Sequence, residues 1–290
     1  MLLLILGGGG QVGTALRERA GAAGHEVAAP SRAELDIGDE AALRLAIQGA
    51  APAVLINCAA YTRVDKAEDD AETAFRINRD GAAHAASAAA EAGIPLIQLS
   101  TDYVFDGRKA GAYSEDDTPN PLSVYGRSKL AGEEGVRQHQ RRHIILRTAW
   151  VFSPWRQNFV LTMRRLASRG RTPLRVVADQ HGGPTSAAAI AACIFGILPQ
   201  ICGPTEPPWG TYHFCGAPPA TWHEFASAIL ADRNDIPIEP IPTTAYPTRA
   251  RRPANSVLDC ARIASAFGIT QPRWREELKV VLAALAENQP

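Results

Sequence analysis

The sequence shows no excess of either charge. Thirty basic side chains balance thirty acidic ones, so the formal net charge is zero and the pI is near 7.1. A chain of this kind generates no large field of one sign. We therefore expect no nucleic acid and no membrane among its partners.

Long apolar runs and paired cysteines are also absent. The opening run, 1–6, has no basic segment before it and is followed by glycines, which favours a buried first strand over a signal peptide. No other apolar stretch approaches the ~18 residues of a transmembrane helix. The five cysteines contain no C-x-x-C pair, so we expect reduced thiols. Together these absences predict a cytoplasmic protein.

The first part of the chain alternates apolar strands with alanine-rich helical segments. At 290 residues and 46% hydrophobic content, the chain can bury one large core or two smaller ones. Strands that are apolar on both faces, each followed by a helix, predict a parallel sheet covered on both sides. The expected strands are 2–6, 26–29, 53–57, 94–100 and 143–148, and the expected helices are 11–23, 39–48, 71–92 and 122–140.

The pattern loosens after the last of these strands. Proline is frequent in 201–210 and 236–253, so both segments are expected to be ordered loops without regular structure. The helical segments between them indicate a second, smaller and mostly helical lobe, followed by a frayed tail at 288–290. The expected helices are 156–169, 186–198, 221–231, 258–267 and 274–287.

The glycine-rich segment near the start carries the strongest local signal. Gly7, Gly10 and Gly13 form a G-x-x-G-x-x-G pattern directly after the first strand and before the first helix. Such glycines let the backbone turn tightly and approach a pyrophosphate, whose charge is stabilised at the helix N-terminus. A flexible turn without a ligand is the alternative. The strand and helix on either side favour a dinucleotide site and a Rossmann-type, doubly wound parallel sheet.

The end of the second predicted strand bears on the choice of cofactor. An NAD-binding protein often carries an acid there for the ribose 2′-hydroxyl, whereas this chain has Ser31 and Arg32. A hydroxyl and a guanidinium suit a 2′-phosphate, which favours NADPH, with NADH as the alternative. Arg32 can also be an ordinary solvated loop residue. Asp36 and Ile37, a few residues on, are candidates for the adenine pocket.

Two further strand ends carry small or hydroxylated side chains. Cys58, Ala59 and Ala60 follow one strand and leave room for a cofactor ribose, although a tight turn explains them equally well. Ser100 and Thr101 end the next strand, and such a pair is often only a turn former. Ligands of open α/β sheets bind outside the carboxyl ends of the strands, so we expect these side chains at one crevice.

Tyr125 and Lys129 are four positions apart near the start of a predicted helix, so they share one face. Most such pairs are ordinary helix residues. Beside a nicotinamide, however, a tyrosine can protonate a ketone oxygen as the carbon accepts hydride, while the nearby ammonium lowers the phenol pKa and binds the ribose. Thr101 would hold the carbonyl oxygen, and the cofactor would carry the hydride chemistry. These three residues are the candidate catalytic group, provided that the glycine turn binds the cofactor.

Seven segments carry a resemblance to a known family. They are GGGGQVG, NCAAYTRVDKAE, STDYVFDG, YGRSKLAGE, RTAWVF, ADQHGGPT and RRPANSVLD, and they follow one another over nearly the whole chain. The sequence resembles the extended short-chain dehydrogenase/reductases and, within them, the dTDP-4-dehydrorhamnose reductase family. This resemblance implies NADPH-dependent reduction of the C4 ketone of dTDP-4-dehydro-L-rhamnose to dTDP-L-rhamnose, the last step of dTDP-rhamnose biosynthesis. The implied partner is thus a dTDP-linked keto-sugar.

The resemblance also implies a division of the chain. The cofactor-binding domain would comprise 1–148, with 178–215 returning to it. The substrate-binding lobe would comprise 149–177 and 216–290.

Roles follow from the resemblance residue by residue. Tyr125 would be the proton donor, Lys129 its partner and Thr101 the carbonyl-binding hydroxyl. The pyrophosphate would lie at Gly10, Gln11 and Val12, the adenine at Asp36 and Ile37, and the nicotinamide side at Ala60, Tyr61 and Thr62. The nucleotide-sugar would contact Val64, Asp102, Tyr103, Trp150, Asn158 and Arg252.

Two of these substrate residues have ordinary alternatives. Trp150 could stack on the apolar face of the sugar, but an isolated tryptophan is more often part of a core. Arg252 could bind the substrate diphosphate, but Arg249 and Arg251 beside it also fit a solvated basic loop.

The chain departs from some family members that join subunits through a metal held by glutamates. Ala15 stands at one ligand position, and 184–192 offers no acid at another. We therefore expect no metal, and a monomer or weak homodimer. Related sugar dehydratases carry an acid at the position of Tyr103, whose phenol is a poor base at neutral pH, so dehydration is not expected.

Two alternatives to a reductase stay open. A nucleotide-sugar epimerase, or another nucleotide-sugar reductase, would use the same residues, but an epimerase would consume no reductant. A non-catalytic regulatory subunit is the alternative from another class, because a relative of this fold is the accessory partner of methionine adenosyltransferase.

Overall fold

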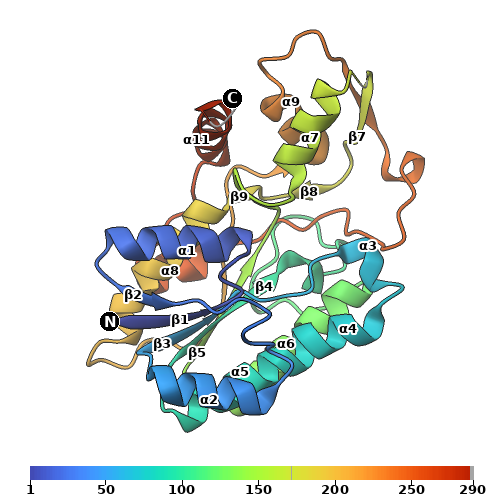
Figure 1. Cartoon of the computed structure of the whole chain (residues 1–290). Helices are drawn as coiled ribbons and strands as arrows, with labels where there is room; N and C mark the ends of the chain where they lie inside the picture. Colours follow the sequence, from blue (N-terminus) through green and yellow to red (C-terminus); the bar gives the residue numbers. More distant parts are fainter. Residues whose placement is uncertain (171, 288–290) are drawn as a thin grey trace.

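The protein consists of a larger lobe built on a sheet and a smaller lobe against the carboxyl ends of its strands (Figure 1). The computed structural model describes residues 1–170 and 172–287, so the predicted tail at 288–290 lies outside the described residues. No helix in the described part of the chain is long and apolar enough to cross a membrane.

The larger lobe is organised by six parallel strands in the order β2-β1-β3-β4-β5-β10. Leu4 of the central β1 lies between Ala28 and Leu55 of its neighbours. Because successive side chains point to opposite faces, Leu3 and Leu4 enter two different cores. The predicted Rossmann-type sheet is confirmed. Its strands are β1 (Leu2–Leu6), β2 (Glu26–Ala28), β3 (Val54–Asn57), β4 (Leu96–Thr101), β5 (His143–Thr148) and β10 (Gly210–His213).

Helices cover both faces of this sheet, α1 and α8 on one and α2, α5 and α6 on the other (Figure 1). Asp39 and Ser123 act as N-caps, accepting hydrogen bonds from the N–H groups of Ala42 and Gly126 at 3.0 and 3.1 Å. The predicted helix 71–92 is divided by one π-helical segment. The elements are α1 (Gln11–Ala22), α2 (Glu40–Ala50), α3 (Val64–Ala67), α4 (Ala71–Phe75), the π segment Arg76–Asp80, α5 (Gly81–Glu91), α6 (Val124–His139) and α8 (Ala187–Ile201).

The smaller lobe has its own aromatic and aliphatic core, which includes Phe152, Phe225 and Trp274. Its helices are α7 (Phe159–Ser168), α9 (Trp222–Ile229) and α11 (Trp274–Glu287). Three short strand pairs lie in this part of the chain. They are β6 (Val151–Phe152) with β9 (Thr185–Ser186), β8 (His181–Gly182) with β11 (Ala220–Thr221), and β7 (Leu174–Val177) with β12 (Ile238–Ile241).

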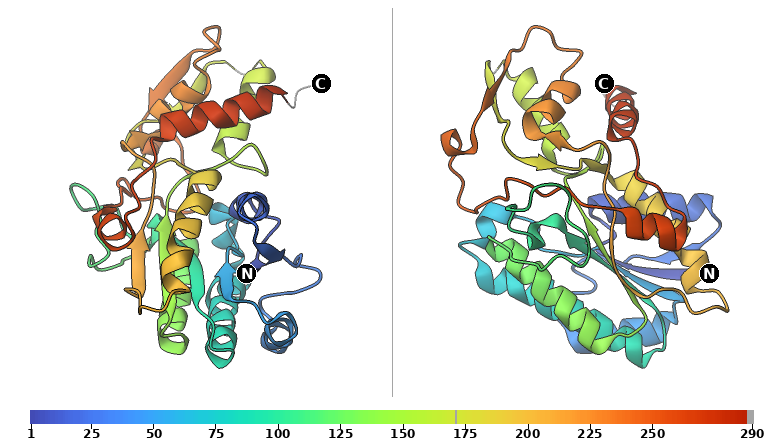
Figure 2. Two further views of the ribbon diagram at one scale, coloured as in Figure 1. Left: turned by 90° about the vertical axis from the view of Figure 1, so that its left-hand side faces the viewer. Right: turned by 180° about the vertical axis from the view of Figure 1, so that it is seen from behind.

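Two expectations about the later part of the chain need correction. Segment 236–253 is not devoid of regular structure, because it contains β12 and a 3₁₀ turn at Thr243–Ala245. Pro240 is tolerated there because β12 is one strand of a two-stranded pair, with a free edge. Helix α10 (Ala261–Phe267) packs against α8 and β10 rather than within the small lobe (Figure 2), although 216–290 was expected to form that lobe.

Candidate active site

The glycine turn between β1 and α1 has the shape that a phosphate group requires. Gly7 has φ +75°, and a Cβ atom there would lie 2.6 Å from the backbone nitrogen of Ala59. A Cβ on Gly13 would strike the carbonyl of Gly7. Gly10, the N-cap of α1, has no side chain to satisfy the first N–H groups of the helix, and the first turn carries no acid. The turn therefore presents an uncapped helix N-terminus, where the charge of an anion is stabilised.

Three side chains fix the small lobe against this turn. The Gln11 side-chain oxygen accepts hydrogen bonds from Ser153 Oγ at 2.8 Å and Asn158 Nδ2 at 3.1 Å. Arg156, in the same loop, has φ +59°, and its Nη2 lies 3.6 Å from where a Cβ on Gly9 would be. No local pattern points to Arg156, because its proximity to the turn depends on the fold.

The residues expected to bind the adenosine end of the cofactor lie in the loop that follows β2. Asp36 accepts hydrogen bonds from the N–H of Gly38 at 2.9 Å and from Arg76 at 3.2 Å, and the first of these is the main cause of its lowered pKa. Ile37 is buried, whereas Ser31 and Arg32 are exposed. Their roles in cofactor binding stay predictions.

The segment after β3 is held in place by two asparagines. Asn57 Oδ1 accepts the N–H of Ala59 at 3.1 Å, and Asn78 Oδ1 accepts the N–H of Tyr61 at 2.8 Å. Asn78 also donates to Ser128 Oγ in α6 at 2.9 Å. The segment predicted to face the nicotinamide is thus coupled to the helix that carries Tyr125 and Lys129.

Thr101, Tyr125 and Lys129 do converge at the carboxyl end of the sheet. Thr101 ends β4, and its hydroxyl hydrogen-bonds with the phenol of Tyr125 in the first turn of α6. Lys129, one helical turn on, is buried and donates to the carbonyl oxygen of Leu99 in β4 at 2.7 Å. Strand β4 and helix α6, which packs against it, therefore hold all three side chains.

The electrostatics of this group differ from the expectation in one respect. Burial raises the pKa of Tyr125 to about 12, and the hydrogen bond with Thr101 offsets only part of that effect. Burial also lowers the pKa of Lys129 to about 8. The phenol pKa is thus raised rather than lowered as expected, because burial dominates and the negative charge of Asp102 acts in the same direction. The raised pKa keeps the phenol protonated near neutral pH.

Asp102 and Tyr103 continue the site from Thr101 toward the small lobe. Asp102 is buried, which raises its pKa to about 7, and it accepts a hydrogen bond from Thr101 Oγ1 at 3.0 Å. Its Oδ2 atom has no hydrogen-bond partner among the described residues. Tyr103 lies edge-on to Tyr125, with ring centroids 6.0 Å apart. An unsatisfied acceptor beside the catalytic group is consistent with a site for a substrate hydroxyl.

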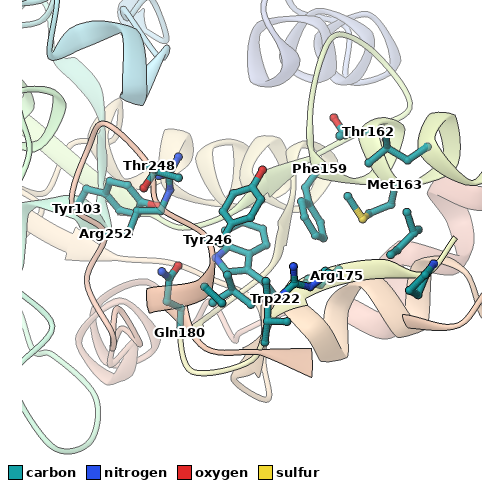
Figure 3. Close-up of a pocket in the computed structure, with 17 residues that line it drawn as sticks. Tyr103, Phe159, Thr162, Met163, Arg175, Gln180, Trp222, Tyr246, Thr248 and Arg252 are labelled. Carbon is teal, nitrogen blue, oxygen red and sulfur yellow. The ribbon is translucent and has the colours of Figure 1, made fainter. Parts of the chain in front are cut away.

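A cavity of about 560 Å³ extends from Tyr103 into the small lobe. Figure 3 shows Tyr103 and Arg252 near one end and Met163 near the other. Aromatic side chains line much of the cavity, with a few polar groups among them, as is usual for sites that bind organic ligands. Only Tyr103 and Arg252 of this lining were predicted from the sequence. The lining residues not predicted include Phe159, Gln180, Trp222, Tyr246 and Thr248.

Three predicted substrate residues have other partners in the structure. Trp150 does not line the cavity; it stacks on Trp222 with ring centroids 3.6 Å apart and an interplanar angle of 6°. Asn158 is the N-cap of α7, accepting the N–H of Leu161 at 3.2 Å. Arg252 lines the cavity but is paired with Asp65. Val64, at the start of α3, is half-buried.

Comparison with known proteins identifies the relatives of this chain. The family described as RmlD substrate binding domain matches residues 1–287. The chain is 41% identical over 291 residues to a dTDP-4-dehydrorhamnose reductase of Sinorhizobium fredii, with 98% of each chain covered. It is 43% identical over 289 residues to the enzyme of that name from Aggregatibacter actinomycetemcomitans, covering 97% of this chain and 98% of that one.

A solved structure supports the same relationship. The dTDP-4-dehydrorhamnose reductase of Bacillus anthracis, determined in complex with NADP, is similar with a TM-score of 0.91 and 33% identity. The match covers 98% of this chain and 99% of that one.

Proposed function

Since the chain belongs to the RmlD substrate binding domain family, we propose that it reduces the C4 ketone of dTDP-4-dehydro-L-rhamnose to dTDP-L-rhamnose with NADPH. This is an NAD(P)H-dependent oxidoreductase activity. The observation that carries the proposal is the hydrogen-bonded group of Thr101 and Tyr125 with Lys129 one turn along the same helix, at the carboxyl end of the sheet.

The cofactor site we propose begins at the glycine turn. The uncapped N-terminus of α1, reached by the tight turn at Gly7, would bind the pyrophosphate. Gly10, Gln11, Val12 and Gly13 would surround the pyrophosphate, Ser31 and Arg32 the 2′-phosphate, Asp36 and Ile37 the adenine, and Ala59, Ala60, Tyr61 and Thr62 the nicotinamide side. The exposed guanidinium of Arg32 supports NADPH, and a relative that binds NADP is consistent with it.

The chemistry we assign to the chain itself is proton donation. Bound NADPH supplies the hydride to the ketone carbon. The Tyr125 phenol is protonated because of its raised pKa, and it donates its proton to the former ketone oxygen. That oxygen accepts the proton because an alkoxide is far more basic than a phenolate. Thr101 orients that oxygen, and the Lys129 ammonium stabilises the phenolate that is left.

The substrate we propose spans the cavity between the lobes. The sugar would lie beside Thr101, Asp102 and Tyr103, at the end of the cavity nearest Tyr125. The nucleotide would extend along the aromatic lining toward Phe159 and Trp222.

A direct assay tests this function. Purified protein with dTDP-4-dehydro-L-rhamnose should oxidise NADPH in proportion to the sugar reduced, faster than NADH at equal concentration. Tyr125→Phe should lower kcat by ~10²–10⁴, because it removes the proton donor. Binding of NADPH, measured by fluorescence titration, should be unchanged, since the substitution keeps the aromatic ring and Lys129.

Two outcomes would contradict the proposal in different ways. Sugar conversion without net NADPH oxidation would indicate an epimerase. No conversion of any keto-sugar, with NADPH still bound, would favour the non-catalytic regulatory subunit. Wild-type turnover in Tyr125→Phe would refute only the role of the phenol as proton donor.

A further inference from the structure

A short helix of the cofactor domain holds the basic loop of the small lobe. Asp65 in α3 accepts hydrogen bonds from Arg252 at both carboxylate oxygens, Nη2 to Oδ2 at 2.6 Å and Nη1 to Oδ1 at 3.1 Å. The same carboxylate accepts the N–H of buried Ala250 at 3.1 Å. Burial raises the pKa of Asp65, but these hydrogen bonds reverse the effect and leave it below its ordinary value. One ionised carboxylate thus fixes both the backbone and the guanidinium of this loop.

The guanidinium held in this way belongs to the cavity wall. Arg252 lines the cavity, and its side chain is 22% exposed (Figure 3). It also hydrogen-bonds with Tyr103, which in turn lies edge-on to Tyr125. Asp65, Arg252, Tyr103 and Tyr125 therefore form an unbroken series of contacts from α3 to the proposed proton donor.

The pairing leaves Arg252 able to bind an anion. A guanidinium has five N–H donors. The carboxylate of Asp65 takes two of them in the planar, two-point arrangement, Nη1 also donates to the carbonyl of Ala250 at 3.5 Å, and Tyr103 takes another. The donor that is left is fixed in direction, so a further acceptor binds without the entropy cost of ordering a long side chain.

We propose that Asp65 is a positioning residue that holds Arg252 at the cavity wall to bind the diphosphate of the nucleotide-linked substrate. This inference rests on the proposed function, and it adds to that function a specific division of work between the lobes. The small lobe provides the cation, and the cofactor domain orients it. A substrate diphosphate is thereby recognised at a fixed distance from Tyr125.

The chain provides a matched control pair. Asp69 follows Asp65 by four residues and pairs with Arg249 of the same loop at 3.0 Å. The side chains of Asp69 and Arg249 are mostly exposed, at 55% and 71%, and neither lines the cavity. Exposed pairs of this kind contribute little, so this pair tests whether any charge contact between the segment 64–69 and the loop is sufficient.

The test compares Asp65→Asn with Asp69→Asn in the complete chain. For Asp65→Asn we expect KM for dTDP-4-dehydro-L-rhamnose and the inhibition constant of dTDP to rise roughly tenfold, because the charge-assisted pair is lost while the shape is kept. The value of kcat should change less than KM. Asp69→Asn should leave both constants unchanged. A lowered KM in Asp65→Asn would mean that Asp65 masks Arg252, and would overturn the proposal.

Exchanging the two charges distinguishes a positioning role of Asp65 from a role in stability alone. In Asp65→Arg with Arg252→Asp the ion pair can form again, so the melting temperature should return toward that of the wild type. KM should stay high, because the cation no longer faces the cavity. Recovery of KM in the double variant would show that the ion pair only stabilises the fold, and would contradict the positioning role. If the wild type itself fails to oxidise NADPH, dTDP binding by calorimetry still compares the variants, so failure of the function and failure of this inference are distinguishable.

Discussion

Lys129 lies in a buried environment that disfavours its charged form. It is buried between β4 and α6, and burial lowers its pKa to about 8, while Glu133 acts in the opposite direction. In the role proposed here the residue must be an ammonium. That form is present below the lowered pKa and is lost as pH rises through it.

We therefore predict that kcat/KM falls as pH increases above about 8. A pH profile of NADPH oxidation at low substrate concentration measures this. Lys129→Arg, which keeps its charge to much higher pH, should move the alkaline limb upward while lowering the maximum rate.

Asp102 provides the control for this profile, because its pKa of about 7 lies close by. Asp102→Asn removes that titration and should leave the limb near pH 8 in place. If instead the limb disappears in Asp102→Asn, Asp102 rather than Lys129 controls the alkaline loss of activity.

Individual residues also show what a sequence can and cannot provide. The spacing of Tyr125 and Lys129 and the glycines near the first strand follow from local geometry, which a sequence contains. The pKa of Tyr125 and the stack of Trp150 on Trp222 depend on packing between segments far apart in the chain. No local pattern specifies such contacts.

Helix α6 carries Tyr125, Lys129 and Glu133 at successive four-residue steps, so the three side chains share one face of the helix. Glu133 is fully buried and accepts hydrogen bonds from Arg147 at 2.9 and 2.7 Å and from Ser100 at 2.6 Å. Ser100 directly precedes Thr101, so this buried pair joins the helix to the strand on which the catalytic hydroxyl lies.

Removal of Glu133 should be strongly destabilising. In Glu133→Ala the guanidinium of Arg147 stays buried without its carboxylate, so the free energy of unfolding should fall by ~3–5 kcal/mol. Urea denaturation followed by circular dichroism measures the loss. Glu134→Ala, at the exposed neighbouring position on the same helix, should change it by less than ~0.5 kcal/mol. Equal effects in both variants would contradict the importance of the buried pair.

At the level of elements, the periodic pattern of apolar residues was sufficient to predict most helices and the first five strands. The short strands were missed because only their partners define them. β10 has four residues and becomes a strand by pairing with β5, and β12 does so with β7 despite its proline. Pairings of this kind are tertiary contacts, which the local sequence does not encode.

The two lobes are joined at both ends of the site. Gln11 bonds to Ser153 and Asn158 beside the glycine turn, and Asp65 bonds to Arg252 beside the cavity. These contacts restrict relative movement of the lobes where the cofactor and the substrate diphosphate are proposed to lie.

For the whole molecule we predict a monomer or weak homodimer whose mass does not depend on metal. Ala15 has no ligand atom, and no group of three potential ligand side chains occurs within 1–170 and 172–287. Light scattering with and without a chelator should give the same mass. A dimer that dissociates when the chelator is added would contradict this prediction.

The position of β10 in the chain affects how the protein can be made. This edge strand pairs with β5, yet about sixty residues separate them, so β5 leaves the ribosome well before its partner exists. During that interval a buried, apolar strand presents unpaired backbone groups to other nascent chains. Fragments that end before residue 210 should therefore aggregate rather than fold as a smaller domain.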